Sequence, residues 1–135
     1  MSRPARGGLP QNNRERLKQD FTRAAVLRDM YPQLAEVRIE LVFQDGTTRP
    51  PSSQSFCCFP AARGFFRYAC PCHSCSGEFD LSGHVAELVR KASSRERTRR
   101  ENVSCTGERT QEAGARTACP IRAQVLISAI LHPAQ

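Results

Sequence analysis

The chain has 135 residues, of which 39% are hydrophobic, and a formal net charge of +7 at pH 7. This length predicts one domain with a modest core. Small domains often need a further stabilising crosslink, such as disulfides or a structural metal ion. The first twenty residues are polar and basic, without the apolar segment of a signal peptide, and the longest apolar stretch is too short to cross a bilayer. We therefore expect a cytoplasmic chain that does not associate with membranes.

The basic residues number 20, and all of them except Lys18 and Lys91 are arginine. An excess of positive charge attracts nucleic acid. A preference for arginine over lysine is also expected of a GC-rich genome, so the charge alone is a weak sign of a polyanionic partner.

The N-terminal half predicts a tail, a helix and three strands. Residues 1–13 carry Pro and Gly among polar residues, so we expect a disordered tail followed by a single domain over residues 14–135. Apolar residues recur with helical spacing over residues 14–30, and Pro32 ends that helix. Residues 37–43 alternate as a half-buried strand that ends at Asp45-Gly46. Shorter strands are expected at residues 55–59 and 64–69.

The C-terminal half predicts one helix and two strands. Asp80 or Ser82 can cap a helix with Val85, Leu88 and Val89 on one face. Residues 93–101 are polar with charges of both signs, which predicts a linker. We expect a short strand over residues 102–105 and a loop over residues 106–118. Alternating apolar residues over 121–131 predict a closing strand.

Seven cysteines, in a chain expected to keep its thiols reduced, indicate metal or redox chemistry more than disulfides. A tetrahedral zinc ion takes four ligands from two tight turns. Cys75 can pair with Cys72 at a two-residue separation or with Cys70 at a four-residue separation. We favour Cys70, because it ends a predicted strand, and keep Cys72 as the alternative ligand or as a reactive thiol.

The second pair of ligands must come from elsewhere. Cys105 precedes a turn at Gly107, and Cys119 precedes Pro120 and the last strand. The residues between them would form a hairpin loop, whose two ends meet if the flanking strands pair. The loop adds little closure entropy, because that cost grows only slowly with loop length. The sequence therefore predicts a structural zinc site made by Cys70, Cys75, Cys105 and Cys119. Cys57 and Cys58 are adjacent on a strand and point to opposite faces, so both cannot serve one site.

The chain resembles zinc-ribbon-like proteins encoded by short bacterial open reading frames. The resemblance lies in the strand over residues 37–43 with Asp45-Gly46, in the segments 65–71 and 75–81, and in Cys105 and Cys119. It implies a ribbon-like or rubredoxin-like metal site and carries no activity with it. The expected fold is α+β, a small antiparallel sheet with a zinc-ribbon-like metal site, an N-terminal helix and one helix after the first cysteine cluster.

Two functions follow from these expectations, and neither is enzymatic, because no open metal position with a general base is apparent. In the first, the protein is a binding module for nucleic acid or for a protein of the transcription or translation machinery. Its phosphate contacts would be Arg63, Arg67, Arg90, Lys91, Arg95, Arg97, Arg99 and Arg100. In the second, it is a thiol-redox or metal-responsive factor that uses Cys72 as a spare reactive thiol.

Overall fold

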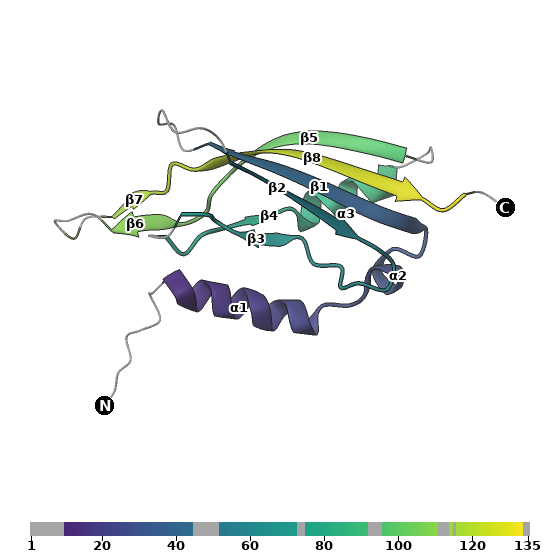
Figure 1. The fold of residues 1–135 in the computed structure, drawn as a ribbon, viewed down its shortest axis with the longest axis horizontal. Helices are drawn as coiled ribbons and strands as arrows, with labels where there is room; N and C mark the ends of the chain where they lie inside the picture. The colour runs from purple at the N-terminus through teal and green to yellow at the C-terminus, as the bar shows by residue number, and fades with distance from the viewer. Residues whose placement is uncertain are drawn as a thin grey trace.

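A computed structural model describes residues 10–44, 52–72, 75–91, 96–110, 114 and 116–133. Its main element is a four-stranded antiparallel sheet in the order β2-β1-β8-β5, made by β1 (Leu34–Gln44), β2 (Ser52–Cys58), β5 (Glu96–Ser104) and β8 (Arg122–Leu131) (Figure 1). Two short hairpins join β3 (Arg67–Ala69) to β4 (Glu78–Asp80), and β6 (Glu108–Thr110) to β7 (Arg116–Ala118). With three helices, α1 (Pro10–Arg23), α2 (Leu27–Met30) and α3 (Ser82–Lys91), the predicted α+β class is confirmed.

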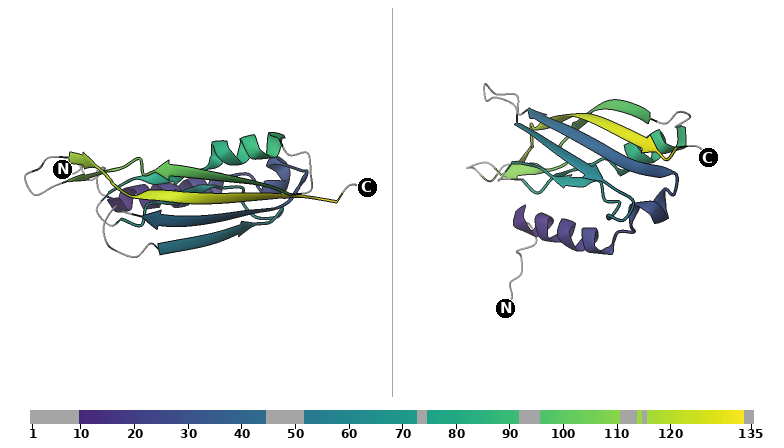
Figure 2. Two further views of the ribbon diagram at one scale, coloured as in Figure 1. Left: turned by 90° about the horizontal axis from the view of Figure 1, so that it is seen from above. Right: turned by 45° about the vertical axis from the view of Figure 1, so that its right-hand side comes forward.

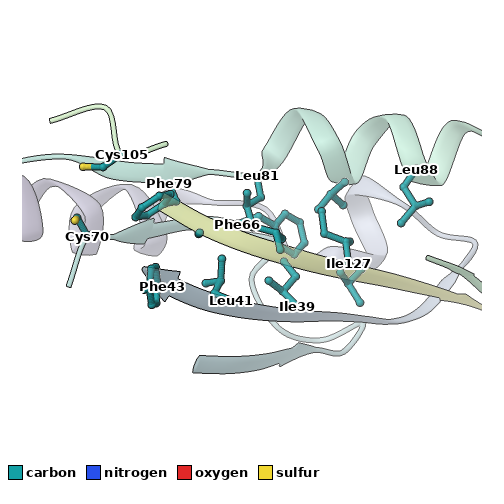
Figure 3. Packing of buried hydrophobic residues seen from close by; sticks show 14 of the residues in the cluster. Ile39, Leu41, Phe43, Phe66, Cys70, Phe79, Leu81, Leu88, Cys105 and Ile127 are labelled. Carbon is teal, nitrogen blue, oxygen red and sulfur yellow. The ribbon is translucent and has the colours of Figure 1, made fainter. Parts of the chain in front are cut away.

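The two central strands, β1 and β8, carry the core. Ile39 lies opposite Ile127, Leu41 opposite Val125, and all four side chains are buried. Because side chains alternate along a strand, the intervening residues point to the other face of the sheet. Figure 3 shows the β1 side chains pointing toward Phe66, Phe79 and Leu81, which belong to the β3–β4 layer. The predicted strands over residues 37–43 and 121–131 are confirmed.

Helix α3 packs on the same face of the sheet, as seen in the left panel of Figure 2. Its apolar stripe, Val85, Leu88 and Val89, is buried as predicted. The carboxylate of Asp80 accepts a hydrogen bond from the backbone N–H of Ser82 at 2.9 Å, which satisfies a donor at the start of the helix.

The single helix predicted for residues 14–30 is in fact two helices. Helix α1 begins at Pro10 and ends at Arg23, and the short helix α2 follows after a break. At the break, Val26 is extended and pairs as an isolated bridge with Arg63. This turn brings the fully buried Leu27 into the core, so tertiary packing overrides the helical periodicity.

The linker predicted for residues 93–101 was wrong where the structure describes it, because residues 96–101 belong to β5. This strand lies at the edge of the sheet and has little apolar alternation. Two of its partly buried side chains, Arg99 and Glu101, form an ion pair, and Arg99 also contacts Glu87 of α3. The predicted loop over 106–118 likewise contains the paired strands β6 and β7.

Some expectations fall outside the described residues. The Asp45-Gly46 turn is one of them, and so are residues 1–9 of the expected tail. Among the helices of the described part of the chain, none has both the length and the apolar character needed to cross a membrane.

Candidate metal centre

The four cysteines singled out from the sequence meet at one end of the core. The sulfur atoms of Cys70, Cys75, Cys105 and Cys119 all lie within 4.8 Å of one another, and all four residues are buried. The Cys70 and Cys119 sulfurs are 3.9 Å apart, and the Cys75 and Cys105 sulfurs are 3.8 Å apart. Four sulfurs around a tetrahedral zinc ion, with bonds of about 2.3 Å, lie about 3.8 Å from one another. The arrangement therefore fits a metal ion of that size.

One pair of cysteines lies in the connection of the β3–β4 hairpin, and the other lies at the open end of the β6–β7 hairpin. Cys70 follows β3 and Cys75 lies just before β4, whereas Cys105 lies just before β6 and Cys119 follows β7. The two hairpins are closed in the same way, because the N–H of Cys70 donates to the carbonyl of Gly77 at 3.2 Å and the N–H of Cys119 donates to that of Gly107 at 3.0 Å. The chain thus brings two equivalent turns together at one point. We call these turns knuckles, one carrying Cys70 and Cys75 and the other Cys105 and Cys119.

The two knuckles approach each other at a pair of glycines. A Cβ placed on Gly77 would overlap the Cys105 sulfur and the backbone nitrogen of Gly107, and would lie 2.7 Å from the Gly107 Cα. A Cβ on Gly107 would in turn lie 2.7 Å from the Gly77 Cα. Because real Cβ atoms do not come this close to backbone, only glycine fits at either position.

Burial is the largest influence on the thiols. It raises the pKa of Cys70 above its ordinary value, raises the pKa of Cys75 to about 12, and raises the pKa of Cys105. Hydrogen bonds from backbone N–H groups act in the opposite direction, as when the N–H of Gly107 donates to the Cys105 sulfur at 3.2 Å. Thiolates in this position are costly unless a cation neutralises them, which is what a bound metal does.

The surroundings of the cluster tie it to neighbouring elements. The Arg14 guanidinium of α1 donates to the carbonyl of Cys70 at 3.1 Å. The hydroxyl of Thr106 both accepts from the N–H of Glu78 and donates to its carbonyl, each at 3.3 Å, and so connects the two knuckles. The Glu78 carboxylate is held by Arg67, with contacts of 2.6 and 2.9 Å, so it is engaged in an ion pair.

Cys72 does not belong to the group of four. It is 8% exposed, and its N–H donates to the Cys70 sulfur at 3.5 Å. Between Cys70 and Cys72, the structure therefore brings Cys70 to the other three sulfurs, as favoured from its place at a strand end. Cys57 is exposed and Cys58 is partly buried, and both lie on β2, outside the cluster.

The basic residues proposed as phosphate contacts fall into two separate groups. Arg63 and Arg67 lie beside α1, where Arg67 pairs with Asp20 and Glu78. The other group lies at the end of α3 and on β5, and comprises Arg90, Lys91, Arg97, Arg99 and Arg100. Within it, Lys91 and Arg99 both contact the carboxylate of Glu87. Arg95 lies outside the described residues.

A signal in the sequence for the paired knuckles was missed. Ala-Cys-Pro occurs at residues 69–71 and again at 118–120, and Cys-Ser-Gly-Glu at 75–78 matches Cys-Thr-Gly-Glu at 105–108. The two motifs occur in opposite order in the two halves, because each hairpin is connected at its other end. A search for repeats in a fixed order does not find them.

Replacing Gly77 or Gly107 by alanine should disrupt the centre. We expect each variant to lose about 1–3 kcal/mol of unfolding free energy from overpacking, and to bind metal more weakly. Gly83→Ala is the matched control, because a Cβ there meets nothing within 4 Å and alanine favours a helix. Urea unfolding of the three metal-loaded variants measures the difference, and equal stabilities would contradict the close approach.

The pH dependence of stability should have opposite signs with and without metal. In the metal-free, reduced protein the thiols of Cys70, Cys75 and Cys105 stay protonated above their ordinary pKa of 9.0, whereas those of the unfolded chain ionise. The unfolded state then binds fewer protons, so the melting temperature should fall as pH rises above about 9. With metal bound, protons compete for the sulfurs and stability should fall on acidification instead.

Melting temperatures measured from about pH 5 to about pH 10.5 cover both the acid loss of metal and the ionisation of free thiols. They give the slope of melting temperature against pH for the loaded and for the stripped protein. The difference between the loaded and the stripped protein removes the contribution of other titrating groups. Parallel curves would show that the four sulfurs do not share a metal.

No family model matches the chain, and no curated protein or solved structure is significantly similar to it. The resemblance to zinc-ribbon-like proteins therefore stays a prediction. What the chain itself offers is a buried cluster of four cysteines that could hold a metal ion.

Proposed function

We propose that the chain is a small zinc-binding protein with a structural site of four cysteine ligands, and that it serves as a binding module for another macromolecule. The observation that supports the first part is the meeting of four buried cysteine sulfurs at distances suited to zinc. Thiolate ligands favour zinc or iron over the hard cations magnesium and calcium.

A structural role is supported by the composition of the site. Four cysteines fill all four positions of a tetrahedral ion, whereas a catalytic zinc keeps one position open for water or substrate. The two carboxylates that follow a ligand most closely along the chain are both near an arginine, since Glu78 pairs with Arg67 and Glu108 lies 3.9 Å from Arg116. We therefore propose no catalytic role for the metal.

The zinc would hold together two short hairpins, of which β3–β4 is also anchored in the core by the fully buried Phe79 of β4. Strands β3, β4, β6 and β7 have three residues each, and an isolated short hairpin is marginal in water. Zinc bound to all four cysteines would join both hairpins to the end of the sheet. Its apparent binding free energy in small zinc domains, about 10–16 kcal/mol, is as large as the stability of a typical domain.

Purified protein should contain one zinc ion per chain by elemental analysis. In chelator, the amide protons of the β6–β7 hairpin should lose their protection from exchange, while those of β1 and β8 keep theirs, because β7 is exposed and the sheet core does not depend on the sulfurs. Cys75→Ser should lose most of the zinc, whereas Cys57→Ser, at an exposed position, should retain it. Folded protein without bound metal, with its β6–β7 hairpin still protected, would contradict the proposal, and iron in place of zinc would correct the metal.

The alternative function, a thiol-redox or metal-responsive factor, depends on the reactivity of Cys72. Its burial argues for a packing role, because a redox-sensing cysteine is accessible to oxidant. We expect iodoacetamide to label Cys57 well before Cys72 in the zinc-loaded protein, as mass spectrometry of peptides would show. Rapid oxidation of Cys72 by peroxide, accompanied by zinc release, would favour the redox function, and Cys72→Ser provides the control.

A further inference from the structure

A groove lies between α1 and the edge of the sheet, apart from the cysteine cluster. Its volume is about 1000 Å³, and its walls come from α1, from β2 and from residues 62–69, which lead into β3. The right panel of Figure 2 shows α1 running below β3, and β2 on the side of β3 that faces away from α1. Of the described residues predicted as phosphate contacts, only Arg63 and Arg67 line this groove.

Aromatic side chains line both walls. On the α1 side, Phe21 packs edge-on against Phe65, with ring centroids 5.7 Å apart. On the β2 side, Phe56 stacks on Tyr68 at 4.5 Å. Phe21 remains 46% exposed and Phe56 37% exposed, so the groove presents apolar surface to solvent. Exposed aromatic residues gathered in a hollow mark a binding surface more often than scattered ones do.

Among the strands that the structure describes, β2 pairs on one side only and so forms an edge of the sheet. β2 is the first strand in the sheet order, and its residues from Ser52 to Cys57 are all exposed. An edge strand offers backbone donors and acceptors to any extended segment that lies beside it. Gln54 and Phe56 lie opposite Leu41 and Ile39 in the register, so they face the same side of the sheet as the core.

The rim of the groove is positively charged. Its described lining includes Arg14, Lys18, Arg63 and Arg67 but no acidic residue. Arg67 is neutralised by Asp20 and Glu78. Arg14 and Arg63 contact only backbone carbonyls in the described hydrogen bonds, and no described ion pair involves Lys18. Three cations therefore border an apolar hollow without carboxylate partners among the described residues.

We propose that this groove binds an extended, acidic and apolar peptide segment of a partner protein. The segment adds to β2 as a further strand, its apolar side chains enter the groove, and its carboxylates face Arg14, Lys18 and Arg63. Alternation along a strand turns every second side chain of the segment toward the groove, so apolar and acidic residues both occupy these alternate positions, the apolar ones over the hollow and the acidic ones at the basic rim. This inference deepens the proposed function, because it names the site and the partner of the binding module.

Two other occupants fit less well. A second copy of the chain would bring a net charge of +7 against the basic rim, and like charges oppose such an association. Single-stranded nucleic acid would stack its bases on free aromatic faces. Here the Phe56 face is covered by Tyr68, and Arg67 lies over the Phe65 ring at 5.6 Å while paired with two carboxylates.

The test is binding of a fluorescein-labelled peptide to the full, zinc-loaded chain at low salt. In this peptide every second residue is in turn leucine or glutamate, and the residues between them are threonine. Anisotropy should rise to saturation, and the same peptide with lysine in place of glutamate should not bind. Phe56→Ser should weaken binding about tenfold, because aromatic residues at the centre of an interface dominate affinity. Lys18→Glu should weaken it several-fold, about 3- to 10-fold, with a reduced dependence on salt.

Matched control variants are available for both changes. Phe59→Ser alters an exposed phenylalanine that does not line the groove, and Lys91→Glu alters the only other lysine, on α3. Both should bind the peptide as the unmodified chain does. Circular dichroism and zinc content of each variant identify any that fails to fold.

Several results would overturn the inference. One is a lysine peptide that binds as tightly as the glutamate peptide, and another is a loss of affinity in the control variants as large as that in the groove variants. A third is an oligonucleotide that displaces the peptide from the unmodified chain but fails to bind the Phe56→Ser variant. A fourth is a dimer of the unmodified chain in sedimentation that becomes a monomer in the Phe56→Ser variant. Absence of peptide binding by protein with one zinc per chain would also overturn it and leave the structural zinc site intact. Absence of zinc from folded protein would instead contradict the proposed function, whatever the peptide does.

Discussion

Four sulfur atoms close one end of the core, and they come from turns that have few other contacts. Burial makes the thiols of Cys70, Cys75 and Cys105 poor acids, so the cluster is stable as neutral thiols or as thiolates that share a cation. The glycine pair brings the two turns into contact, and no larger residue fits at either place. The position of both hairpins, and through Arg14 that of α1, depends on how this small volume is filled.

The elements that could be predicted from the sequence are those with a face in the core. Strand β8 alternates from Ala123 to Ala129 because every second side chain is buried against β1 and the β3–β4 layer. β5 lacks this pattern because it lies at the edge, where Arg99 and Glu101 are satisfied by ion pairs. The break before Leu27 could not be foreseen either, because it depends on Arg63, which is distant in the sequence.

The choice of cysteines was predictable in the same local sense. Cys75 follows from either spacing, and Cys70 from its place at the end of β3. That Cys105 and Cys119 would join them required the pairing of β6 with β7, which carries little apolar signal because both strands are polar. The sequence pointed to only one wall of the groove beside α1, through Arg63 and Arg67, since the lining comes from four separate parts of the chain, α1, β1, β2 and residues 62–69.

The order of the repeated motifs has a consequence for the unfolded chain. The sulfurs that meet across the two knuckles are 30 residues apart for Cys75 and Cys105, and 49 apart for Cys70 and Cys119. A metal bound to all four therefore acts as a crosslink around a closed loop that contains α3 and β5. By analogy with a disulfide closing a loop of about 30 residues, this restriction is worth about 3–4 kcal/mol in chain entropy. The helix and the edge strand, neither of which supplies a ligand, would share in the stability that the centre provides.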